Sequence, residues 1–117
     1  MSLESDLSTL LKAICVRTFP DIAPANTGAP WITWQGLGGE ALRYGDSTAP
    51  DKRNTLMQIS VWSKTRLEAL SLIRQAEEAL CAHSAWVCAP AGEALSTYEP
   101  DTQLYGCIQR FDIWAAR

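Results

Sequence analysis

The sequence contains no apolar run that approaches the roughly 20 residues needed to cross a lipid bilayer. Its first six residues also lack the positive flank and the continuous apolar stretch of a secretory signal, so we expect the N-terminal segment to be retained in the mature protein. These absences argue against a membrane protein and predict a protein of the cytoplasm.

An excess of basic residues is also absent. Ten Lys and Arg residues stand against thirteen Asp and Glu residues, which gives a formal net charge of −3. A surface whose main task is to grip phosphates is usually strongly basic, so a nucleic-acid-binding module is disfavoured. Steeply salt-dependent affinity for duplex DNA would revive that alternative.

Residues for metal or thiol chemistry are few. The chain has four cysteines without a C-x-x-C pair and a single histidine: Cys15, Cys81, Cys88, Cys107 and His83. Cys81 and His83 are fewer ligands than a structural zinc site requires, so we expect reduced thiols, no metal and no cofactor. A small thiol enzyme that uses Cys81 or Cys88 with His83 stays an alternative, although no base-orienting third group is evident.

The clearest pattern that is present is a strand leading directly into a helix. Within residues 55–62, one face carries Met57, Ile59 and Val61, and the other carries Gln58, Ser60 and Trp62. Thr65 and Glu68 have the spacing of a capping box, in which each side chain accepts a hydrogen bond from a free amide at the helix start. A helix is therefore predicted over residues 64–82.

A second helix is predicted at the N-terminus. Ser2 caps a leucine-rich segment with helical spacing, Arg17 lies near its C-terminal end, and Phe19-Pro20 ends it. After an irregular, proline-rich connection, residues 31–35 are aromatic and β-branched and predict a strand.

The C-terminal third predicts two more strands. The first covers residues 85–88, is interrupted by proline and glycine, and resumes over residues 94–98. The last covers residues 104–114 and places Gln109 on its apolar face. We therefore predict one α+β domain over residues 1–117, with the order αββαββ and a mostly antiparallel four-stranded sheet that has both helices packed on one face.

Two features predict an interaction surface. Residues 37–53 form a long central loop of mixed charge, and long loops in compact domains are usually functional. The interface candidates in this loop are Arg43, Asp46, Asp51, Lys52 and Arg53.

The second feature is the set of five tryptophans, all in predicted strands. Trp31 and Trp34 are three positions apart and so point to opposite faces of a regular strand. The plain interpretation is that these rings fill a small core. The alternative is that Trp62 and one of this pair lie opposite the core and are covered by a partner subunit, and we take Trp34 and Trp62 as the candidates.

The order of several segments resembles the tail completion, or tail terminator, proteins of long-tailed bacteriophages and their prophages. The resemblance covers nearly the whole chain. It rests on the leucine-rich first helix and on FPDIAP (19–24), APWITW (29–34), QISVWS (58–63), DTQLY (101–105) and FDIW (111–114). The family tends to have tyrosine where Trp31 stands, and its central loop varies.

This resemblance implies an α+β structural protein and no enzymatic activity. Such proteins form a ring, usually of six copies, that caps the tail tube in the host cytoplasm and later joins the tail to the head connector. The implied partners are further copies of the chain, the tail tube protein and the connector or stopper protein, with DNA passing through the lumen without specific binding. The alternative within the same class is a head-to-tail adaptor that stays monomeric until it docks.

Overall fold

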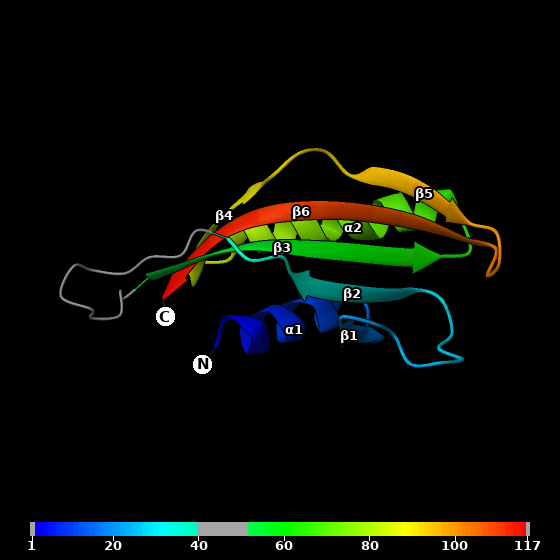
Figure 1. Ribbon diagram of the computed structural model, residues 1–117, viewed down its shortest axis with the longest axis horizontal. Helices are drawn as coiled ribbons and strands as arrows, with labels where there is room; N and C mark the ends of the chain where they lie inside the picture. The colour runs from blue at the N-terminus through cyan, green and yellow to red at the C-terminus, as the bar shows by residue number, and fades with distance from the viewer. Residues whose placement is uncertain (1, 40–51, 117) are drawn as a thin grey trace.

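The computed structural model describes residues 2–39 and 52–116 (Figure 1). The described elements are α1 (Leu3–Ile14), β1 (Thr18–Pro20), β2 (Trp31–Gly36), β3 (Lys52–Ser63), α2 (Arg66–Ala82), β4 (Trp86–Pro90), β5 (Leu95–Glu99) and β6 (Leu104–Ala116). The fold is α+β, as predicted. The predicted order αββαββ and the four-stranded sheet are wrong, because the described strands form a six-stranded sheet and the described elements follow the order αβββαβββ.

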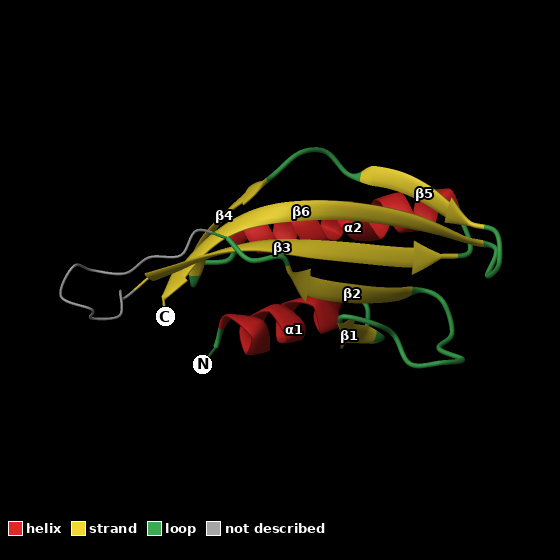
Figure 2. Ribbon diagram, in the orientation of Figure 1, coloured by secondary structure: helices red, strands yellow, loops and turns green. Residues whose placement is uncertain are grey.

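The sheet is built around the two longest strands. Its order is β1-β2-β3-β6-β4, and β5 also pairs with β6 (Figure 2). β3 and β6 are antiparallel along the whole of β3, from Lys52 opposite Ala116 to Ser63 opposite Tyr105. Only the pairing of β1 with β2 is parallel among the described strands. The sheet is therefore mostly antiparallel, as predicted.

The two additional strands have different origins. β1 has three residues, too few for a readable alternation, and ends at the proline that was expected to stop the helix. β4 and β5 pair with successive parts of β6, so the edge of the sheet is one interrupted strand. At the interruption, Ala91 N donates to Arg110 O (2.8 Å) and Gln109 Nε2 donates to Gly92 O (3.0 Å).

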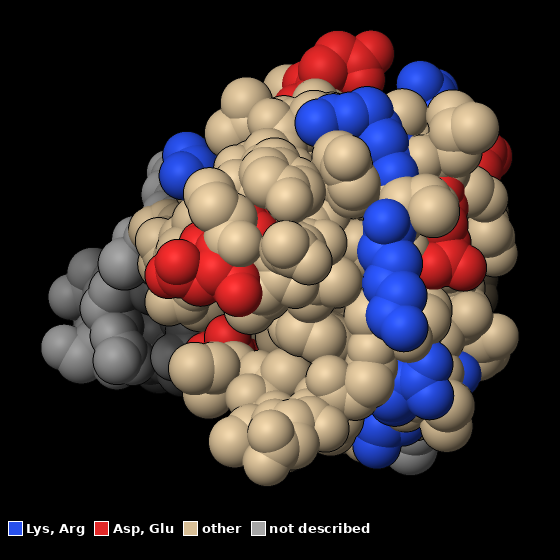
Figure 3. Space-filling model, turned by 90° about the vertical axis from the view of Figure 1, so that its right-hand side faces the viewer, with Lys and Arg blue, Asp and Glu red and all other residues tan. Residues whose placement is uncertain are grey.

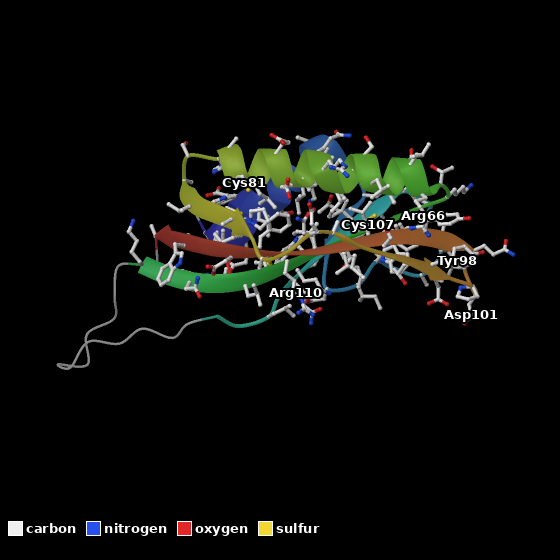
Figure 4. The ribbon with its side chains drawn as sticks, turned by 90° about the horizontal axis from the view of Figure 1, so that it is seen from above. Arg66, Cys81, Tyr98, Asp101, Cys107 and Arg110 are labelled. Atoms are coloured by element: carbon white, nitrogen blue, oxygen red, sulfur yellow. The ribbon has the colours of Figure 1, made fainter. Side chains whose placement is uncertain are left out.

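Both helices cover the same face of the sheet, as the view from above shows (Figure 4). The core between them is apolar and includes Leu7, Leu11, Ile32, Met57, Ile59, Val61, Ile73, Ala76, Leu80, Phe111 and Ile113. The predicted apolar face of the central strand is therefore confirmed. Gln109 lies on the same face and is 3% exposed, because α2 and the β4–β5 connection supply its polar partners.

The helix starts follow local chemistry. Ser2 Oγ accepts from Ser5 N (3.1 Å) at α1, and Thr65 Oγ1 accepts from Glu68 N (3.2 Å) at α2. The second half of the predicted capping box is different, because Thr65 N donates to Ser63 Oγ, whose hydroxyl in turn donates to the Glu68 carboxylate.

The end of α1 differs from its prediction. The helix ends at Ile14, and Cys15 is already extended. Arg17 therefore lies beyond the helix, where its guanidinium donates to Pro30 O (2.9 Å) and Ala29 O (3.3 Å) and holds the connection that precedes β2. Neither helix among the described residues has the length and apolar composition of a membrane span.

Candidate interaction surface

The face of the sheet opposite the helices is the candidate interaction surface. Because side chains alternate along a strand, the residues between the buried positions point away from the helices. We call this surface the open face and define it by its five large apolar side chains: Trp31, Leu56, Trp62, Ile108 and Trp114. All five are only partly buried, so apolar area remains available on this face.

One end of the open face carries a pair of tryptophans, Trp31 and Trp62. Trp31 lies directly opposite Trp62 in the β2–β3 register. On its other side, Trp62 faces Gly106 of β6, and a Cβ atom built on Gly106 would lie 2.8 Å from Trp62 Cζ3. The missing side chain at Gly106 therefore leaves the space in which the Trp62 ring lies.

Polar side chains cross the remainder of the open face in pairs. Asn54 Nδ2 donates to Asp112 Oδ1 (2.6 Å), and Arg110 Nε donates to Gln58 Oε1 (3.3 Å). These bonds link β3 to β6, so apolar and polar groups both have defined positions. A mixture of this kind is typical of protein–protein interfaces.

The open face continues to the edge formed by β4 and β5. Val87 is 71% exposed and lies opposite Trp114, and Leu95 is 64% exposed and lies opposite Ile108. Within the described residues, β4 and β5 pair only with β6, so their outer backbone groups are available to a further strand.

Comparison with known proteins now identifies the family. The sequence model of the family described as "Tail completion protein gp17" matches residues 3–116. The chain belongs to this family. A search of curated proteins found no match. The resemblance to phage tail completion proteins is thereby confirmed, and it assigns the protein to the bacteriophage tail, as a structural component that contacts other tail and head proteins of the virion.

The two predicted tryptophan candidates of this tail completion protein lie on opposite faces. Trp62 is on the open face, as expected. Trp34 instead shares the helix-covered face with Ile32 and packs against the core, so the predicted position of Trp34 is corrected to Trp31. The signal was in the sequence, because Trp31 shares its face with Thr33 and Gln35 and the other face carries Ile32.

The charged candidates are only partly described. Arg43, Asp46 and Asp51 lie outside the described residues. Lys52 and Arg53 are in β3 and not in a loop; Lys52 is exposed, and Arg53 forms an ion pair with Glu4 of α1 (2.8 Å).

The predicted loop also begins later than expected. Leu37 N donates to Leu56 O (2.7 Å), and Leu56 N donates to Gly38 O (2.8 Å). These bonds extend the pairing of β2 and β3 beyond Gly36. The predicted boundaries of the loop at residues 37 and 53 are therefore corrected inwards at both ends.

The candidate catalytic residues of the alternative thiol enzyme, His83 and Cys88, have surroundings that do not favour that chemistry. His83 stacks on Trp86 with ring centroids 4.2 Å apart, and its Nδ1 accepts from Ala85 N (3.2 Å). Burial, and then charge and hydrogen-bond interactions with Cys81, raise the pKa of the Cys88 thiol to about 12. This is the opposite of the lowered pKa that activates a thiol nucleophile. No group of three metal ligands occurs in the part of the chain that the structure describes.

Charge at one end of the molecule is mixed. Figure 3 shows Lys and Arg side chains in a stripe at this end, with acidic side chains on either side of it. One residue near this end, Arg66, lies with its guanidinium 5.1 Å from the centre of the Tyr105 ring, which in turn packs on Tyr98. Basic and acidic side chains alternate across this end. This arrangement suits contact with a protein better than contact with the uniformly negative phosphate backbone of DNA.

Proposed function

We propose that this tail completion protein assembles into a ring of six copies that caps the tail tube and later meets the head connector. The family supplies the general role, and the open face is the observation that carries the proposal. It presents five partly buried large apolar residues on a rigid sheet, with polar pairs among them. Exposed apolar patches of this kind usually mark interfaces.

A ring needs two different surfaces on each subunit, because a head-to-tail contact joins unlike patches. The open face is one candidate, and the interrupted edge formed by β4 and β5 is part of the same continuous area through Val87 and Leu95. The central loop, with Arg43, Asp46 and Asp51, supplies the second candidate, together with the exposed Lys52 at the start of β3. Arg53 has a structural role in this proposal, because it already pairs with Glu4.

In this proposal, the ring forms in the host cytoplasm on the completed tail tube, and DNA later passes through its lumen. The net charge of −3 supports this role. A lumen rich in phosphate contacts would release counterions on binding and hold DNA in place. An acidic subunit favours free passage.

The test compares two Leu→Glu variants at exposed positions. Leu95→Glu places a charge at the edge of the open face, and Leu67→Glu places the same charge on α2, where Leu67 is 80% exposed. Neither position is in the core, so both variants should fold. Light scattering across a concentration series, with and without tail tube protein, should show a ring for the wild type and for Leu67→Glu but not for Leu95→Glu.

Two results would contradict parts of the proposal. If Leu95→Glu assembles as well as Leu67→Glu does, the open face and its edge are not the ring interface. If the wild type stays monomeric with tail tubes and assembles only with the head connector, the monomeric adaptor is the correct function. Deletion of residues 40–51 tests the loop separately, since unchanged assembly and tail joining would remove it from the interface.

A further inference from the structure

Cys81 and Cys88 lie on either side of the turn that joins α2 to β4. Cys81 is exposed in the last turn of α2, next to β4 (Figure 4). Cys88 is half-buried and lies opposite Ile113, which places its side chain on the face of the sheet that α2 covers. Both thiols therefore occupy the space between the end of the helix and the edge of the sheet.

The turn between the two cysteines is held by specific contacts. Trp86 Nε1 donates to Leu80 O (2.9 Å), which ties the start of β4 to the residue before Cys81. His83 stacks on the same indole ring. The end of α2 packs against β4, and Cys81 is near enough to Cys88 to contribute to the raised pKa of the Cys88 thiol.

We propose that Cys81 and Cys88 are a dithiol site that closes to a disulfide when the protein meets an oxidising disulfide such as oxidised glutathione. In the first step, the Cys81 thiolate attacks one sulfur of oxidised glutathione, forms a mixed disulfide and releases one glutathione thiolate. In the second step, the Cys88 thiolate attacks Cys81 Sγ and releases the second glutathione. Two cysteine thiols are oxidised, and one oxidised glutathione is reduced to two glutathione molecules.

The two steps have different rates because the two thiols have different surroundings. Cys81 is exposed and is available to the oxidant. Cys88 is half-buried, and burial raises the pKa of its thiol, so little of it is thiolate at neutral pH. The mixed disulfide on Cys81 should therefore form first, and ring closure should accelerate as pH rises, because more of Cys88 becomes thiolate.

The other cysteines are poorly placed to compete. Cys107 lies six positions from Ile113 along β6, which is about 20 Å in a strand, and Cys107 is fully buried. Cys15 is also buried, and its Sγ lies 3.5 Å from Pro30 O. The proposed pairing is therefore specific to Cys81 and Cys88.

The dithiol site does not depend on the proposed ring. It would stay reduced in the cytoplasm, where thiols are kept reduced. It would close after release of a virion into oxidising surroundings, where they are not. The disulfide would join the end of α2 to the edge strand β4 through a short loop of residues 81–88.

The test uses the purified full-length protein, reduced and then exposed to oxidised glutathione at pH 7 and pH 9. Trypsin combined with a glutamate-specific protease releases residues 79–93, which contain Cys81 and Cys88 but not Cys107. The expected peptide is two hydrogens lighter than the reduced form, resists alkylation, and stays joined after chymotrypsin cuts behind Trp86. Closure should be faster at pH 9, and the oxidised protein should have a higher Tm than the reduced one.

Two Cys→Ser variants make the test decisive. Cys88→Ser should accumulate a stable glutathione adduct on Cys81, and Cys81→Ser should react slowly or not at all; neither should gain Tm on oxidation. Persistent adducts on wild-type Cys81 at pH 9 without ring closure would overturn the proposal. So would a disulfide that joins Cys81 or Cys88 to Cys15, to Cys107 or to a second chain.

Discussion

The indole of Trp62 lies over Gly106, the residue directly opposite it in the β3–β6 ladder. A Cβ atom on Gly106 would lie 2.8 Å from Trp62 Cζ3 and 3.0 Å from Thr97 Cγ2, closer than side-chain carbons normally approach. The glycine therefore lets the ring of Trp62 lie across β6 towards β5. This relationship connects three strands of the open face and gives its largest side chain a defined position.

We predict that Gly106→Ala displaces the Trp62 ring. The added methyl group overpacks the contact, which should lower the free energy of unfolding by about 1–3 kcal/mol and shift the tryptophan fluorescence. The matched control is Gly36→Ala in β2, where an added Cβ meets nothing within 4 Å. Urea denaturation with fluorescence detection measures both effects, and equal losses in the two variants would contradict the contact.

A second prediction concerns Gln109, which is 3% exposed. Its Nε2 donates to Glu77 Oε1 (2.8 Å) and to Gly92 O (3.0 Å), so it supports both α2 and the connection between β4 and β5. Gln109→Leu leaves these two acceptors without their donor and should cost about 1–3 kcal/mol of unfolding free energy.

The control for this change is Gln58→Leu on the open face of the same sheet. Gln58 Oε1 accepts from Arg110 Nε in an exposed bond, and water can replace either partner there. The cost should stay below about 0.5 kcal/mol. The midpoints of urea denaturation, compared at equal m-values, decide the question; a cost at Gln58 that matches the cost at Gln109 would rule out a special role for the buried amide.

A third prediction concerns pH. The pKa of Cys88 is raised from 9.0 to about 12 in the folded protein, chiefly by burial. Above pH 9 the unfolded chain therefore releases this proton more readily than the folded chain does, and the contribution of Cys88 to stability is lost as pH rises from about 9 to about 12. Below pH 9 the contribution is fully present.

Replacement of the thiol isolates this effect from the titration of other groups. In the presence of a reducing agent, Cys88→Ala should lose stability less steeply than the wild type between pH 9 and pH 11, while the two curves run parallel from pH 6 to pH 8. Thermal unfolding at each pH measures the difference. Parallel curves above pH 9 would show that Cys88 does not have a raised pKa.

Several parts of the fold could be predicted because the chemistry that specifies them is local. Ser2 and Thr65 cap their helices as the sequence indicated, since a hydroxyl at a helix start needs only the amides of the next turn. The alternation in β3 likewise predicted which residues face the core. Local chemistry did not predict β1, whose three residues become a strand only because β2 is beside them.

The sequence predicted an interaction surface with tryptophans opposite the core, but it did not predict every residue of that surface. Trp62 was assigned to the open face correctly, whereas Trp34 was chosen where the structure has Trp31. Alternation states that Trp31 and Trp34 differ in face, and the apolar Ile32 beside Trp34 could have indicated which of the two faces the core. The pairing of Trp31 with Trp62 shows that Trp31 lies away from the helices. Arg53 was assigned to an interface because it was expected in the central loop. Its ion pair with Glu4, 49 positions away, could not be read from the local sequence.

The sequence by itself determined the two helices, the long strands, the α+β class and the membership in the tail completion family, because capping, alternation and the order of motifs can be read along the chain. Only the tertiary structure decided that Gly106 lies beneath Trp62, that β4 and β5 share one edge of β6, and that Cys88 lies on the face of the sheet that α2 covers. These relationships join residues whose distance in space depends on strand register and helix packing, and a local pattern carries no information about either.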